Sequence, residues 1–334
     1  HPSACASASC RSTRASAPSV KRLDALGSLS HGRAVALMVL VTLLWSIAGV
    51  VTRHLEAARS FEVTFWRSFF NAAFMVVALA LWKGKGLWAE LRDGGWPLWM
   101  SGVMWSIMYT CFMVAITLTT VANVLVTMAL GPLMTALLAR LALGHRLPAR
   151  TWAAIAAAGV GIAWMYGREL AGAELRHLVG TFVALGVPVA AAINWTVIQR
   201  TTHQPSYGRR RDMLPAVLIG AVISAAVTLP LAWPLQASVH DLGLLATLGV
   251  FQLAVPCLIA VQLARVLPAP EVALLALLEV IFGVAWAWLG ANEVPSPHVL
   301  QGGVLVLGAL VLNEALGLRR SKAVAPTAAA IDPS

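Results

Sequence analysis

NVLVTMALGPLMTALLARLALGH, residues 123–145, and EVALLALLEVIFGVAWAWLGANE, residues 271–293, can be laid on one another without a gap, so that Ala129 falls on Leu277. Their identity is low, but they agree in length and in the turn that follows. Each is long enough to cross a ~30 Å hydrocarbon core, which takes roughly 20 helical residues. The two stretches therefore predict one membrane-spanning segment that occurs in both halves of the chain.

Apolar stretches of similar length recur on both sides of these two. The runs are continuous rather than alternating, and in lipid each segment must satisfy its own backbone hydrogen bonds, so helices are expected. The sequence predicts an all-α membrane protein with ten transmembrane helices at about 35–53, 62–82, 97–117, 120–141, 150–167, 179–199, 213–233, 242–264, 269–290 and 298–318.

The composition agrees with lipid as the solvent. The chain has 334 residues, of which 59% are hydrophobic and only 11% charged, and its mean hydropathy is +0.78. A soluble domain is closer to a quarter charged. The cysteines and histidines show no metal-ligand spacing, and no histidine falls at membrane depth, so we expect neither a metal nor a cofactor.

The positive charges predict an orientation. With the N-terminus inside, nineteen of the 24 Lys and Arg residues lie in cytoplasmic segments and four on the other face. Such an excess is typical of cytoplasmic loops. The N- and C-termini are therefore predicted to be cytoplasmic. Because the charges are distributed between apolar segments rather than gathered on one face, nucleic acid is not expected as a partner.

Five spans in each half is an odd number, so the second half must enter the membrane from the opposite face. This predicts two inverted five-helix repeats, an arrangement in which transporters bind substrate between the repeats. The predicted units are a disordered cytoplasmic tail (1–34), the first repeat (35–167), the second repeat (179–318) and a cytoplasmic tail (319–334). Whether residues 1–32 belong to the native protein is left open, since a transit peptide has a similar composition.

Four motifs resemble the EamA family of the drug/metabolite transporter superfamily. They are LLWSIAGVVTR (43–53), TFWRSFF (64–70), MALGPLMTALLARLALGHRL (128–147) and APEVALLALLEVIFGVAWAWLGANE (269–293). The resemblance covers nearly all of residues 35–318. It implies a bacterial inner-membrane carrier built as two five-helix repeats, and it says almost nothing about the substrate.

Two departures from the family pattern stand out. His145 occupies a position where the family usually has Glu, and Val280 follows the glutamate of the ninth span where the family usually has Pro. Because proline is the usual cause of a kink, we expect the ninth span to be straighter here.

Glu279 is the clearest candidate for function, since an ionisable residue near the membrane midplane is costly and is a functional candidate by default. We interpret it as a substrate-binding or proton-coupling residue, with a helix-packing hydrogen bond as the alternative. Arg67 in the second span, with Asn71 one turn on, is the other charged candidate. Arg67 is expected to pair with Glu62 or Glu279, either as a structural ion pair or as part of the translocation path.

Further polar and aromatic residues complete a predicted central cavity. Each of them is individually more typical of packing than of binding. They are Asn194, Trp195, Tyr109, Trp105, Trp45, Ser46, Asn123, Thr127, Gln252 and Gln262.

The sequence thus predicts a secondary transporter that moves a small metabolite across the bacterial cytoplasmic membrane by alternating access. An amino acid or related compound is the suggested substrate, and family analogy favours efflux. A membrane-embedded enzyme and a channel are the alternatives, although neither a catalytic cluster nor a filter-like repeat is visible. The expected partners are the small-molecule substrate and the lipid bilayer, and a homodimer is left open.

Overall fold

The computed structural model describes residues 30–84, 86–143, 149–167, 175–203, 212–263, 266–267 and 275–324. These residues form helices joined by short connections, and no strand occurs among them. Most of both predicted tails, His145, and much of the stretch between the two predicted repeats lie outside the described residues. The elements are α2 His31–Ser46, α3 Ala48–Thr52, α4 Ser60–Lys83, α5 Gly86–Asp93, α6 Gly95–Leu118, α7 Val121–Met128, α8 Gly131–Leu143, α9 Ala149–Gly167, α10 Leu175–His203, α11 Leu214–Ala232, α12 Val239–Thr247, the π-helix η2 Leu248–Ala254, α13 Val255–Leu263, α15 Leu278–Ala291 and α16 Pro297–Val324.

The protein is a multi-pass membrane protein by the length and composition of its helices. Six described helical stretches are long and apolar enough to cross a bilayer: His31–Thr52, Ser60–Lys83, Gly95–Leu118, Leu175–Ile198, Leu214–Ala232 and Val239–Leu263. Shorter apolar helices occupy Val121–Thr135, Leu278–Ala291 and Pro297–Asn313. Large apolar side chains such as Leu81, Phe182 and Val304 are exposed, as is expected where lipid is the solvent. The count of ten spans stays a prediction.

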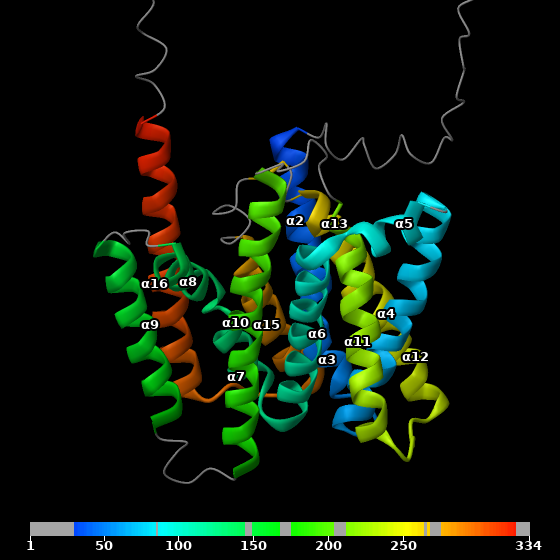
Figure 1. Ribbon diagram of the computed structural model, residues 1–334. Coiled ribbons are helices and arrows are strands. Elements are labelled where there is room, and N and C mark those ends of the chain that lie inside the picture. The colour runs from blue at the N-terminus through cyan, green and yellow to red at the C-terminus, as the bar shows by residue number, and fades with distance from the viewer. Residues whose placement is uncertain are drawn as a thin grey trace, which may run out of the picture.

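The helices run alternately up and down through the bundle, so that α2 begins and α16 ends at the same end of the molecule (Figure 1). Helices α9 and α16 pack together along one edge, and α4 packs on α11 toward the other. Between them α10 packs along α6 and contacts α7 and α8, while α2 packs on η2 and α13 and contacts α15. Helix α15 also contacts α7, which brings the two stretches of the internal repeat side by side.

The predicted fourth span is broken, because α7 ends at Met128 and α8 begins at Gly131. Pro132 explains the break, since proline has no N–H to donate and its ring clashes with the carbonyl four residues earlier, which is that of Met128. The predicted span at 120–141 is therefore helical but interrupted at residues 129 and 130.

The ninth span is also interrupted, at Leu277, directly before α15. Whether the ninth span is straighter than in the family stays a prediction, since residues 268–274 lie outside the described residues. In the gapless sequence alignment of the two stretches, Leu277 corresponds to Ala129. The breaks in the two related segments therefore fall at matching positions. The first span breaks as well, at Ile47 between α2 and α3.

Two fully buried carboxylates fasten the connections at the end of the bundle where α4 and α12 begin. Asp241 accepts hydrogen bonds of 2.9–3.0 Å from the backbone N–H groups of Glu56, Ala57 and Ala58. Glu62 accepts 2.8 and 2.7 Å hydrogen bonds from the N–H groups of residues 236 and 237. Each acid thus satisfies backbone donors on a connection distant in sequence, which is how a buried charge becomes affordable.

We expect Asp241→Ala to destabilise the protein by about 3 kcal/mol, because it leaves several buried N–H groups without an acceptor. In detergent solution this corresponds to a melting temperature lower by roughly 5 °C. The matched control is Asp93→Ala, since Asp93 is exposed and pairs only with its neighbour Arg92. Equal melting temperatures for the two variants would contradict the role given to Asp241.

Candidate functional site

Arg67 lies on α4 in the interior of the bundle, with only 2% of its surface exposed. Its Nε donates to Oε1 of Gln252 at 3.0 Å, and its guanidinium carbon lies 5.5 Å from the centre of the Phe112 ring. Nη1 has no hydrogen-bond partner, and no carboxylate of the described residues lies within 4.0 Å. The predicted ion pair with Glu62 was wrong, because that carboxylate binds backbone N–H groups instead.

Gln252 connects Arg67 to the break in the first span, since its Nε2 donates to the Trp45 carbonyl at 3.1 Å. It belongs to η2, in which the N–H of Val255 reaches back five residues to the carbonyl of Val250. Pro256 follows, and its ring would clash with the carbonyl of Gln252 four residues earlier, so the wider π-helix relieves that clash. Short π-helices occur frequently at functional sites.

Asn71 lies one turn beyond Arg67 on α4 and is fully buried. It is adjacent to the Tyr109 hydroxyl, yet neither polar atom of its amide has a hydrogen-bond partner of normal geometry among the described residues. Tyr109 is itself buried, and its hydroxyl has only a long contact of 4.0 Å with the sulfur of Cys257. The predicted residues Arg67, Asn71, Tyr109, Gln252 and Trp45 thus come together in one buried polar cluster.

Aromatic residues extend this cluster along α6 toward α10. Trp105 packs on Tyr109 with ring centres 5.5 Å apart and meets Trp195 of α10 edge-on at 6.3 Å. Asn194, fully buried, accepts a 2.6 Å hydrogen bond from Ser101. The predicted residues Trp105, Trp195 and Asn194 therefore continue the same interior region.

Glu279 lies in the first turn of α15, directly after the break at Leu277, and is half-buried. It is within electrostatic reach of both Arg67 and Cys257, but no ion pair or hydrogen bond joins it to another described residue. The break places its carboxylate at a helix N-terminus, where negative charge is favoured. The sequence predicted that Glu279 could pair with Arg67. The two side chains are within electrostatic reach but form no ion pair.

The remaining predicted residues make local hydrogen bonds. Ser46 donates to the Leu43 carbonyl, Thr127 donates to the Asn123 carbonyl, and Asn123 donates to the Thr119 hydroxyl. Gln262 is buried near the end of α13. None of these hydrogen bonds reaches the Arg67 cluster, and a role in substrate binding stays a prediction for all four. They are Ser46, Asn123, Thr127 and Gln262.

Phe112, Cys257 and Ser101 belong to the region but were not predicted from the sequence. A signal for two of them was present, because Ser101, Trp105, Tyr109 and Phe112 recur at helical spacing and share one face of α6. Cys257 could not be found this way, since the π-helix changes the register of its span.

A second polar cluster closes the end of the bundle opposite the start of α2. Arg53 forms a 2.9 Å ion pair with Glu293, and its other guanidinium nitrogens donate to the carbonyls of Ile116 and Thr119. Glu293 also accepts a 2.7 Å hydrogen bond from the N–H of Val121. Sequence reasoning gave this pair no role, although Glu293 ends one of the two repeated stretches. The cluster connects the ends of α3, α6, α7 and α15.

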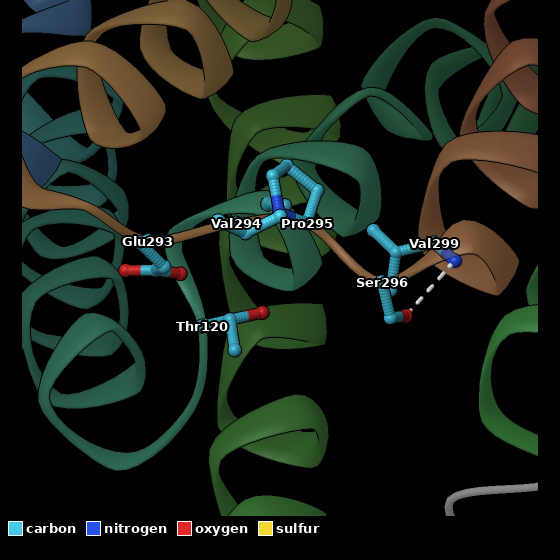
Figure 2. Close-up of a pocket in the computed structure, with 7 residues that line it drawn as sticks. Thr120, Glu293, Val294, Pro295, Ser296 and Val299 are labelled. Atoms are coloured by element: carbon cyan, nitrogen blue, oxygen red, sulfur yellow. Dashed lines mark hydrogen bonds between the residues drawn. The ribbon is translucent and has the colours of Figure 1, made fainter.

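A small pocket of about 110 Å³ lies beside this ion pair. Figure 2 shows Glu293, Val294, Pro295 and Ser296 along the connection between α15 and α16, with Thr120 nearby on the connection before α7. The pocket is too small for most metabolites. None of the residues that line it belongs to the Arg67 cluster. The lining residues are Thr120, Ala122, Glu293, Val294, Pro295, Ser296 and Val299.

Comparison with known proteins identifies the family. Residues 32–167 and 178–314 each match the EamA-like transporter family. The chain belongs to this family. Two matches in succession, separated by only ten residues of sequence, also coincide with the two halves that contain the repeated stretches.

Individual relatives of this EamA-like chain are distant. Pseudopaline exporter CntI of Pseudomonas aeruginosa, in strains UCBPP-PA14 and PAO1, is 25% identical over 285 residues, covering 83% of this chain and 94% of the relative. A solved crystal structure with 19% identity covers 87% of this chain and 99% of its own, with a TM-score of 0.59. That structure supports the fold alone.

Proposed function

We propose that this protein is a secondary carrier that exports a small metabolite across the bacterial cytoplasmic membrane by alternating access. Membership of a transporter family and the likeness to an exporter support transport. The single observation that carries the proposal is Arg67, a buried cation with an unpaired donor at the place where broken or widened helices meet. Discontinuous helices surround the substrate site in many secondary transporters.

Inverted repeats are supported by the pattern of neighbours. In the first half-to-half contact, α10 packs on α6, and α2 correspondingly packs on η2 and α13. In the second, α10 packs on α7 and α8, and α2 and α3 correspondingly pack on α15. In three further contacts each helix packs on its own counterpart in the other half. These pairs are α4 with α11, α7 with α15 and α9 with α16. An axis in the membrane plane that relates the two five-helix halves would produce this set of neighbours.

Orientation follows from the same proposal. With the N-terminus inside, the cluster of Arg53 and Glu293 faces away from the cytoplasm. We assign this pair to an outer gate that holds the exit closed while substrate enters from the cytoplasm. A charged hydrogen-bonded pair that joins four helix ends suits this role, because it can break and re-form without unfolding the helices.

Transport itself is tested by counterflow in proteoliposomes that contain the full chain and an internal pool of unlabelled amino acids or related metabolites. We expect at least one labelled compound of the panel to accumulate transiently and saturably. Vesicles without protein are the control. Failure of every compound to exceed empty vesicles would contradict the proposed function.

The outer gate is tested with Glu293→Gln. Losing roughly 1 kcal/mol of ion-pair energy should shift a two-state equilibrium about fivefold toward the outward-open state. The reporter is Ala122→Cys, a buried pocket residue, in a background without the native cysteines, labelled by a membrane-impermeant maleimide. Glu90→Gln, which removes an acid paired with Lys83, is the matched control. An unchanged labelling rate in Glu293→Gln would rule out the gate.

Proton coupling is tested with Glu279→Gln, which cannot exchange a proton. We expect the variant to lose the dependence of the transport rate on pH, because the carboxyl of Glu279 is within reach of the Arg67 charge and has no direct partner. Glu56→Gln is the control, since Glu56 is exposed. A pH profile like that of the wild type would contradict coupling through Glu279.

A further inference from the structure

We propose that Arg67 and Asn71 form the subsite that binds a carboxylate group of the transported molecule. This inference rests on the proposed carrier function and adds to it the chemical class of the substrate. It is carried by two buried polar side chains. Nη1 of Arg67 and both polar atoms of the Asn71 amide have no hydrogen-bond partner of normal geometry among the described residues.

The first part of the argument is the energetic position of Arg67. A buried charge that lacks its partner destabilises a protein by about 3–5 kcal/mol. Gln252 and the Phe112 ring provide only neutral contacts, and Nη1 has none. A cation retained under these conditions is explained if an anion occupies the open side for part of the working cycle.

Asn71 gives an independent indication of the same kind. Nearly all buried side-chain polar groups are hydrogen-bonded, so an amide with two unpartnered atoms needs an explanation. One turn separates it from Arg67, which places both side chains on the same face of α4. The Tyr109 hydroxyl lies within reach of the Asn71 amide, and its contact with the Cys257 sulfur is long at 4.0 Å, so it can supply a third donor.

These groups select for an anion. An arginine guanidinium presents several donors and no acceptor, in a planar arrangement that matches a carboxylate. The Asn71 amide and the Tyr109 hydroxyl can donate to the same two oxygens. A metal cation or an ammonium group would instead meet the positive charge of Arg67 and be repelled.

No acid of the described residues takes this place. Glu62 directs its Oε1 to two backbone N–H groups and makes no ion pair with Arg67, although its Oε2 has no hydrogen-bond partner. Glu279 is within electrostatic reach of Arg67 but makes no ion pair or hydrogen bond with it among the described residues, so it leaves the donors open. The other titratable groups close enough to influence Arg67 are the phenol of Tyr109 and the thiol of Cys257, which are neutral in their ordinary state.

The guanidinium is also held in place before any ligand arrives. Gln252 fixes the Nε edge, and Phe112 covers one face. Gly249 lets η2 approach α4 closely, because a Cβ there would lie 2.7 Å from the Arg67 carbonyl oxygen. A donor fixed in this way loses little freedom on binding, which favours affinity.

The first experiment compares acids with their uncharged amides. Counterflow in proteoliposomes uses labelled phenylalanine, histidine and glutamate, each beside its α-carboxamide. We expect at least one acid to be transported and its amide to be slower by about tenfold, the effect of about 1.4 kcal/mol of lost binding. Amides transported as fast as the acids would overturn the carboxylate subsite and leave the carrier intact. Transport of neither would overturn the carrier function and the subsite with it.

The second experiment separates binding from folding. Asn71→Leu removes an amide that has no partner, so we expect an unchanged or higher melting temperature together with a KM for the acid raised about tenfold. Arg67→Gln should abolish saturable transport of the acid, and Arg92→Gln, which removes an exposed charge, should not change it. A lower melting temperature of Asn71→Leu with an unchanged KM would assign Asn71 to structure and overturn the proposal.

Discussion

A bilayer provides no water to hydrogen-bond a backbone N–H or C=O group, so each group that leaves a regular helix inside the bundle needs a partner from the protein. This chain leaves regular helix at Ile47, between Met128 and Gly131, and at Leu277. Several of its polar side chains lie at these breaks and at the helix ends.

Several charged and amide side chains of the described residues serve this task. Gln252 satisfies the Trp45 carbonyl at the break in the first span. Glu62 and Asp241 accept from backbone N–H groups of connections, and Arg53 donates to carbonyls at the end of α6. Arg67 is different, because no backbone group accepts from it. Arg67 bonds Gln252 but keeps Nη1 without a partner, and burying a charge in this way costs stability.

The sequence was sufficient to predict where apolar helices lie, because that depends only on the length of each run and on the charges between runs. It also contained the cause of the break before Gly131, since Pro132 disturbs the carbonyl four residues earlier. The interruption itself was not predicted. The partner of Arg67 could not have been predicted. The choice between Glu62 and Gln252 depends on the path of residues 236 and 237 and on the register of η2, which are properties of the folded chain.

The two halves differ where the proposed site lies, and the difference has a chemical consequence. The gapless superposition that aligns Ala129 with Leu277 also aligns Gly131 with Glu279, so only one of the two matching breaks carries a carboxylate. A helix N-terminus favours negative charge in either half, but only α15 provides it from its own side chain. With Arg67 on α4, the interior therefore has a cationic group and a carboxyl group that the repeat does not duplicate. Two halves with this asymmetry can orient a polar ligand in one direction, which a strictly symmetric pair could not do.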